Sequence, residues 1–188
     1  MKKQKMINTK KAVIATLFFG AVSFGYAQTT TMPSDSAKVE TAQTQTASAN
    51  PEIDTLKKQV ATNANDTAAL VKLATAYQDA KDLPNALATW KNISTLLPDW
   101  APGYYSQGYV YQSMKDDANA KTAYEKYITS VKPEELEANK KNLAYAEFFV
   151  AYNLKDTDKE SAKQHIAKSL EYDPMNADAT KLKTFLNQ

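Results

Sequence analysis

Apolar and small side chains recur at helical spacing between residues 67 and 134, and the whole pattern repeats after 34 residues. Leu70 corresponds to Tyr104, and Ala74 corresponds to Gly108. A fixed period of this length predicts stacked helical hairpins, each of which buries its apolar face against the next. Small side chains let the two helices of a hairpin approach closely, and large ones fill the space between hairpins. The other pairs at this spacing are Tyr77 and Tyr111, Ala86 and Ala120, and Trp90 and Tyr124.

The two units resemble tetratricopeptide repeats, which carry a large residue, a small residue and Tyr on the first helix, and Ala, an aromatic residue and Pro on the second. Gln107 departs from the family, which prefers Leu there. The resemblance implies an all-α, right-handed solenoid of about three hairpins, with a short N-terminal helix and a C-terminal capping helix. The residues that carry it are Leu70, Leu73, Ala74, Tyr77, Ala86, Trp90 and Pro98 in the first unit, and Tyr104, Gly108, Tyr111, Ala120, Tyr124 and Pro133 (one place late) in the second.

The helical repeat domain is predicted to cover residues 51–188. We expect repeats at about 67–100, 101–134 and 142–176, followed by a capping helix at 177–188. Arrays of this kind need a terminal helix with a polar outer side to close the exposed core. The residues of the capping helix that are predicted to face inward are Leu182, Phe185 and Leu186.

The third repeat departs most from the pattern. Ala162 keeps the spacing expected of its second helix. If Tyr152 is the repeat Tyr, one residue is inserted before Ala162, and Phe149 then occupies the position of a small residue. Thr157 and Glu160 are predicted to form a capping box at the start of the second helix.

The N-terminal segment 1–27 has the features of a secretory signal. A Lys-rich start precedes the apolar run at residues 12–19, and small residues precede a predicted cleavage between Ala27 and Gln28. The alternative is an uncleaved anchor, although the run is short beside the roughly 20 apolar residues of a spanning helix. Residues 28–50 are predicted to be a disordered polar linker. We therefore expect an exported protein, periplasmic or secreted, of a Gram-negative-type bacterium, with no membrane insertion after removal of the signal.

The charge balance depends on that segment. Without residues 1–27 the chain loses five of its 23 basic residues and none of its 21 acids, which leaves 18 Lys against 21 acids and a net charge of −3. Every basic residue is Lys, and no basic patch is left, so nucleic acid is not an expected partner. The chain has no Cys, which excludes disulfides, thiol catalysis and thiolate metal sites. No metal site and no cofactor are expected.

The one histidine, His165, is the only candidate for acid–base chemistry of the usual kind. A catalytic role would need a nucleophile or a carboxylate held against it. Because His165 directly precedes Ile166, which is predicted to face the core, we expect it to be solvated on the surface. Acidic pairs at residues 116–117 and 134–135 fall at predicted turns and helix starts, where capping and the helix dipole favour them. No catalytic residue is predicted, and the protein is not expected to be an enzyme.

The concave side that the resemblance implies is the predicted binding site. Tyr105 and Tyr109 are expected to anchor a peptide or a partner helix, because Tyr offers contact area and a hydroxyl at low entropy cost. Gln78 and Gln112 would then bond the backbone of the peptide. The alternative is that Tyr105 and Tyr109 pack on each other or under a neighbouring loop. The full set of predicted groove residues is Val71, Thr75, Gln78, Tyr105, Tyr109, Gln112, Val150 and Asn153.

The sequence leaves two candidate functions. The first is a non-enzymatic protein–protein interaction module, an adaptor or scaffold of the cell envelope that binds a peptide or helix in its concave groove. The alternative is a structural envelope protein that self-associates into a homo-oligomer through the exposed face of its C-terminal helix. The resemblance favours the first by analogy of fold, which does not by itself determine function.

Overall fold

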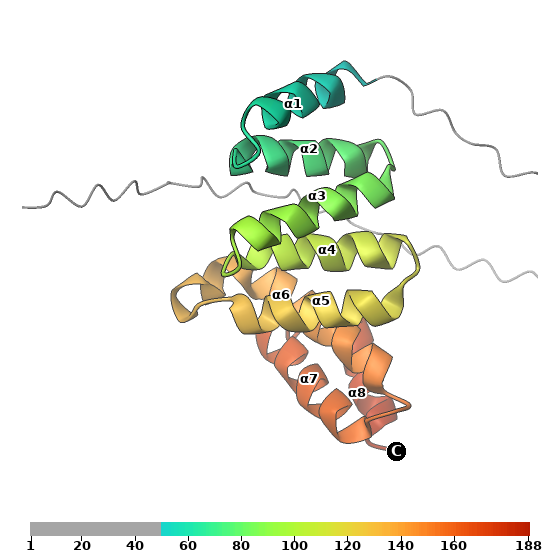
Figure 1. The fold of residues 1–188 in the computed structure, drawn as a ribbon. Coiled ribbons are helices and arrows are strands. Elements are labelled where there is room, and N and C mark those ends of the chain that lie inside the picture. Colours follow the sequence, from blue (N-terminus) through green and yellow to red (C-terminus); the bar gives the residue numbers. More distant parts are fainter. Residues whose placement is uncertain (1–49) are drawn as a thin grey trace, which may run out of the picture. The chain divides into compact units, whose positions relative to one another are not determined.

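The structure is a computed structural model that describes residues 50–188. The predicted signal segment and nearly all of the predicted linker lie outside these residues. The described chain forms eight α-helices, and Figure 1 shows them following one another in sequence order. None of these helices combines the length and the apolar content that crossing a membrane requires. Their bounds are α1 Pro51–Thr62, α2 Thr67–Asp79, α3 Leu83–Leu96, α4 Ala101–Ser113, α5 Asp117–Ser130, α6 Leu136–Leu154, α7 Lys159–Tyr172 and α8 Ala177–Leu186.

The helices pair into three hairpins, which are α2–α3, α4–α5 and α6–α7. Helix α1 packs on α2, and α8 packs on α7, so a single helix lies at each end of the array. The third hairpin begins with a short 3₁₀ helix, Pro133–Glu135, which leads directly into α6. An all-α fold of stacked hairpins, as predicted from the 34-residue period, is confirmed.

The buried clusters show how each hairpin is completed by the first helix of the next unit. Val110 from α4 is buried in one cluster with Trp90 and other residues of α2 and α3. Val150 from α6 is buried in the next cluster with Tyr124 and other residues of α4 and α5. Because no hairpin covers its own apolar face, the array is stable only as a stack.

Polar side chains cap most of the helices at their first turn. The carboxylate of Asp82 accepts a hydrogen bond from the backbone N–H of Asn85 at 3.3 Å, and Asp116 caps α5 in the same way. Such a cap satisfies one of the donors that a helix start leaves free. At α7 the cap is Asp158, whose Oδ1 accepts from the N–H of Ser161 at 3.1 Å. The predicted capping box of Thr157 and Glu160 was therefore wrong by one residue.

At Gly108 the backbone of α4 lies directly against the ring of Tyr124 on α5. A Cβ atom at this position would lie 2.7 Å from the ring of Tyr124, closer than real Cβ contacts allow. Tyr124 itself is completely buried. In the first hairpin Ala74 and Ala86, the corresponding small positions, are also completely buried. The expected role of small residues in bringing the helices together is therefore seen in both hairpins.

The third hairpin has a different register from the predicted one. Its turn is one residue shorter, because the N–H of Asp158 bonds the carbonyl of Leu154, whereas the N–H of Asp82 bonds the carbonyl of Tyr77, five residues back. Leu154 therefore occupies the repeat Tyr position, and Ala151, which is completely buried, occupies the small position. The first two turns contain Lys81 and Lys115 at φ 60° and 61°, the only non-Gly residues with positive φ in the described chain, and the shorter turn has no counterpart.

This register corrects the prediction at two residues. Phe149, predicted at the small position, instead packs in the core with its ring 5.1 Å from that of Tyr124. Tyr152, predicted as the repeat Tyr, keeps 51% of its surface exposed. The insertion of one residue before Ala162 was wrong in sign, since the structure shows a deletion of one residue.

Replacing Gly108 by Ala should lower the free energy of unfolding by about 1–2 kcal/mol. The added methyl must displace the buried ring of Tyr124, and this overpacking outweighs the gain of about 1 kcal/mol in helix propensity. Gly103→Ala is the comparison, because its Cβ would lie 2.9 Å from the Ser94 hydroxyl, the end of a small side chain that can shift more easily than a buried ring, although it accepts from Gln107 at 2.7 Å. Urea denaturation followed by circular dichroism measures both. Equal stability of the two variants would contradict the tight contact at Gly108.

Candidate functional site

The register of the third hairpin determines which side chains continue the predicted binding surface. Counting from the repeat Tyr, Phe148 and Tyr152 in α6 correspond to Tyr105 and Tyr109 in α4. Helix α8 begins after its cap Asn176 as α2 begins after Asp66, so it extends the same rows. We call this set the inner face. Its members are Val71, Thr75 and Gln78 on α2, Tyr105, Tyr109 and Gln112 on α4, Phe148, Tyr152 and Lys155 on α6, and Lys181, Phe185 and Gln188 on α8.

The inner face opens into a groove at its C-terminal end, between α6 and α8. This groove has a volume of about 340 Å³ and is open to solvent. We call it the α6–α8 groove. Its lining residues are Phe148, Tyr152, Lys155, Asp178, Lys181, Leu182 and Phe185.

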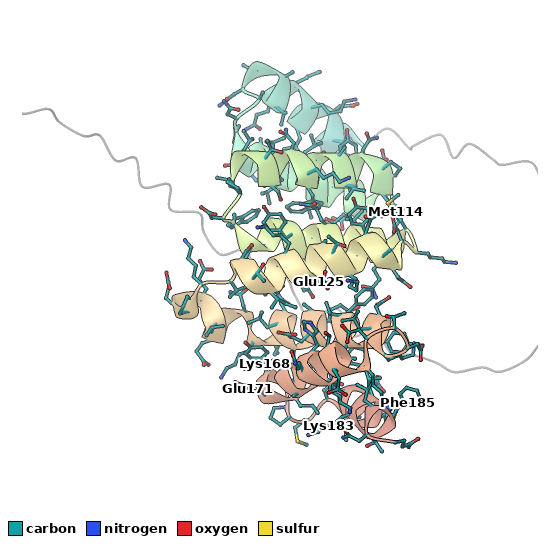
Figure 2. The ribbon with its side chains drawn as sticks, turned by 60° about the horizontal axis from the view of Figure 1, so that its bottom comes forward. Met114, Glu125, Lys168, Glu171, Lys183 and Phe185 are labelled. Carbon is teal, nitrogen blue, oxygen red and sulfur yellow. The ribbon has the colours of Figure 1, made fainter. Side chains whose placement is uncertain are left out.

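The lining of the α6–α8 groove is aromatic and partly exposed. The rings of Phe148 and Tyr152 lie 6.2 Å apart, and Tyr152 and Phe185 expose 51% and 49% of their surfaces. Figure 2 shows Phe185 on α8, at the C-terminal end of the array. The prediction that Phe185 faces inward was therefore wrong, whereas Leu182 and Leu186 are buried as expected. Exposed large apolar side chains that gather at one place mark an interaction surface more often than isolated ones do.

Two lysines border the α6–α8 groove. The Nζ of Lys155 lies 4.1 Å from the centre of the Tyr152 ring, a cation–π contact, and 3.0 Å from Asp156. The Nζ of Lys181 lies 3.1 Å from Asp178, and both side chains are mostly exposed. Ion pairs on the surface contribute little to stability, so these lysines can exchange partners at little cost.

Tyr105, a predicted anchor, is partly buried and packs against the core. Its ring makes edge contacts with Tyr124 at 5.5 Å and Tyr127 at 5.1 Å between centres. Burial raises the pKa of Tyr105 far above its usual value near 10, with smaller contributions from Tyr145 and Tyr109. The alternative that Tyr105 packs internally is thus the one that the structure supports, although its partners are the tyrosines of α5 and not Tyr109.

The two glutamines of the predicted groove support buried aromatic side chains. The indole N–H of Trp90 donates to Oε1 of Gln78. In the next hairpin, Oε1 of Gln112 accepts from the hydroxyls of Tyr124 at 3.2 Å and Tyr145 at 2.7 Å. Both glutamine carbonyls therefore satisfy polar groups of the protein itself, which a buried donor requires. Only the side-chain N–H groups of these two glutamines would remain to bond the backbone of a peptide.

The remaining predicted groove residues, Tyr109 among them, are half-buried or buried. Val150 is completely buried, so its placement on the groove surface was wrong: it corresponds to Leu73 in the core. Asn153 is half-buried, and its amide donates to the carbonyl of Phe149 at 2.9 Å. Val71 and Thr75 are half-buried on α2, where the Thr75 hydroxyl donates to the Val71 carbonyl at 3.0 Å.

His165 is not a fully solvated residue as predicted. Its Nδ1 lies 2.5 Å from Oε2 of Glu147, and the Glu147 side chain is only 5% exposed. In the corrected register Glu147 replaces the large apolar residue found at Leu70, so His165 provides the partner that a buried carboxylate needs. The Ser169 hydroxyl donates to the Ala144 carbonyl at 2.7 Å and completes the polar contacts of this seam. The pair is explained as a structural contact between α6 and α7.

A signal for the α6–α8 groove is present in the sequence, in the spacing of the helix caps. On α6, Phe148 and Tyr152 correspond to Tyr105 and Tyr109 only if one residue is deleted in the third turn. On α8, Phe185 corresponds to Thr75 when the count starts from the cap Asn176. Counting from Asp158 rather than from Tyr152 shows this deletion, because Asp82 and Asp116 cap the equivalent helices. In the described part of the chain no group of three or more His, Asp or Glu residues could hold a metal ion.

The middle hairpin matches a known family. Residues 103–131, which span most of α4 and α5, match the tetratricopeptide repeat family. No curated protein sequence is significantly similar to the chain.

Solved structures share the fold. The C-terminal part of a TPR repeat-containing protein from Cytophaga hutchinsonii has a TM-score of 0.61 and 25% identity, over 69% of this chain and 52% of that one. MamA from Desulfovibrio magneticus RS-1 has a TM-score of 0.56 and 19% identity, over 72% of each chain. The APC/C hetero-tetramer Cut9–Hcn1 has a TM-score of 0.52 and 19% identity, over 72% of this chain and 26% of that one. The described part of the chain therefore has the fold of tetratricopeptide repeat proteins.

We predict that Tyr105→Ala destabilises the array by about 3 kcal/mol, because it removes a ring packed between the two tyrosines of α5. Tyr105→Phe keeps those ring contacts and should unfold at nearly the wild-type temperature. Thermal melts followed by circular dichroism compare the two variants. A Tyr105→Ala protein with unchanged melting would place Tyr105 on the surface, where the repeat pattern alone puts it.

Proposed function

Because the fold is that of tetratricopeptide repeat proteins, we propose that this protein is a non-enzymatic interaction module that binds a protein segment in the α6–α8 groove. Repeats of this family are typically protein–protein interaction modules. The described residues include no catalytic constellation besides the His165–Glu147 pair, which the packing of α6 on α7 explains. The proposal places binding at the C-terminal end of the inner face.

One observation carries the proposal: Tyr152 and Phe185 are half-exposed aromatic side chains that line one open groove. Tyr105 of the inner face, by contrast, packs against the α5 tyrosines. Aromatic side chains in a depression are the usual anchors of a protein interface, since they bury much apolar area at low entropy cost. Lys155 and Lys181 supply the charged border that gives such a site its orientation.

We further propose that the module works in the cell envelope or outside the cell. The support is the sequence of residues 1–27, with its Lys-rich start and apolar run before small residues. The adaptor or scaffold role follows from this location together with the fold. The similarly folded Cut9–Hcn1 is itself a hetero-tetramer, a precedent for assembly by this fold.

Export should produce a mature protein that begins at Gln28. N-terminal sequencing of the protein purified from fractionated bacteria tests this. We expect it in the periplasmic fraction or the medium, because cleavage after Ala27 leaves no apolar segment to retain it. Recovery from the membrane fraction with residues 1–27 still attached would favour the uncleaved anchor.

Partner capture should depend on the aromatic lining of the α6–α8 groove. The wild-type protein and the double variant Tyr152→Ala with Phe185→Ala would be immobilised and exposed to an envelope extract. We expect the double variant to lose the partners that the wild type retains, since both anchors are removed while the half-exposed positions leave the core intact.

The matched control is Met175→Ala, which removes an apolar side chain that is 90% exposed and lies outside the groove. It should capture the same partners as the wild type. Identical captures by all three proteins would remove the α6–α8 groove as the binding site.

A further inference from the structure

The α6–α8 groove has a large apolar side chain at its own border. Phe185 belongs to the groove lining and also exposes half of its surface to solvent. A surface that offers both a depression and an exposed ring can be complementary to itself under a two-fold rotation. In such an isologous contact each ring enters the groove of the other subunit.

The charges at the groove are also self-complementary. Its lining carries two cations, Lys155 and Lys181, and one anion, Asp178. A two-fold axis at the groove allows Asp178 of one copy to lie against Lys155 of the other, whereas a uniformly acidic partner would face one repelling group and a uniformly basic partner would face two. Asp178 is held only by an exposed ion pair to Lys181, so a change of partner costs little.

The ends of the array do not favour association by continued stacking. On α8 the positions that would receive a following helix carry Thr180, Thr184 and Asn187, all exposed and polar. At the other end, Glu52 and Gln59 on α1 take the positions of the buried Ala86 and Ile93, and both are exposed. Polar terminal faces close a repeat array. A second copy would therefore meet the inner side of α8 and not its end.

From the exposed ring and the mixed charges we infer that the occupant of the α6–α8 groove is a second copy of this chain. Two copies associate about a two-fold axis, with Phe185 of each in the groove of the other and Asp178 of each facing Lys155 of the other. The inference rests on the proposed function, because it identifies the partner of the same interaction surface. The contact is confined to the last hairpin and α8, so it belongs to the small, transient class of interfaces.

Sedimentation velocity over a concentration series tests the inference on the purified protein. The wild type should shift from the monomer mass towards twice that mass as concentration rises. Phe185→Ala should remain monomeric at every concentration, and Met175→Ala, outside the groove, should behave as the wild type. A circular dichroism melt confirms that each variant is folded.

Exchanging the charges of Asp178 and Lys155 tests whether these two residues face each other across the two-fold axis. Asp178→Lys places like charges together in its own dimer, and Lys155→Asp does the same with the opposite sign, so each variant alone should be monomeric. An equimolar mixture restores both attractions and should form a heterodimer. If the mixture dimerises, misfolding of the single variants cannot be the reason why each is monomeric, and the two-fold contact is supported.

Two results would overturn the inference. One is a wild type that stays monomeric over the whole series; the other is a dimer that persists in Phe185→Ala. Neither result touches the proposed function, which fails only if capture of other proteins is independent of Tyr152 and Phe185. A monomer that still captures a foreign protein through those two side chains would show that the groove takes a different protein partner.

Discussion

The close approach of two helices at a small residue is the contact on which the array depends. Gly108 brings α4 against the ring of Tyr124, and a single methyl group would have no room there. Ala74 and Ala86 make the equivalent approach in the first hairpin, and Ala151 lies in one buried cluster with Ala162 in the third. Once the pair is close, the apolar residues on its outer side can be covered only by the next hairpin. The small positions therefore determine the spacing of each hairpin, and this spacing determines the stack.

The same geometry explains why so much of the inner face is used internally. A tightly packed second helix directs large aromatic side chains towards the first helix, and their polar atoms need partners when buried. Gln78 and Gln112 accept from Trp90 and Tyr124 respectively, and Tyr105 covers the ring of Tyr124. In the third hairpin Ile166 takes the position of Trp90 and Tyr124. Because its side chain has no polar atom, it needs no hydrogen-bond partner from α6. At this end of the inner face Tyr152 on α6 and Phe185 on α8 are half-exposed and line the groove.

The third hairpin illustrates how the length of a turn changes which side chains a helix exposes. The turn between Leu154 and Asp158 is one residue shorter than the other two turns, and the helices still pack. Each residue of α6 therefore takes a different position in the repeat from the one predicted. In the observed register Val150 is buried in the core, and half of the Tyr152 surface is exposed. Glu147 is placed where an apolar residue is usual, and His165 from α7 provides its partner at 2.5 Å. A groove bordered by Lys155 and lined by Phe148 results from the same shift.

The class of fold, the number of hairpins and most helix starts could be predicted from the sequence alone. Periodic small and aromatic residues, together with capping side chains such as Asp82 and Asn176, are local signals that no distant contact needs to complete. The exposure of the predicted groove residues was predicted less well. Val150 is buried and Tyr105 packs against the α5 tyrosines, whereas the α6–α8 groove includes residues of α8, a helix that was not predicted to contribute. These points depend on the folded chain, because the exposure of a side chain is set by the neighbour that covers it. On the sixth helix that neighbour changes with a one-residue difference in turn length, and only the packed structure shows which register allows the core to close.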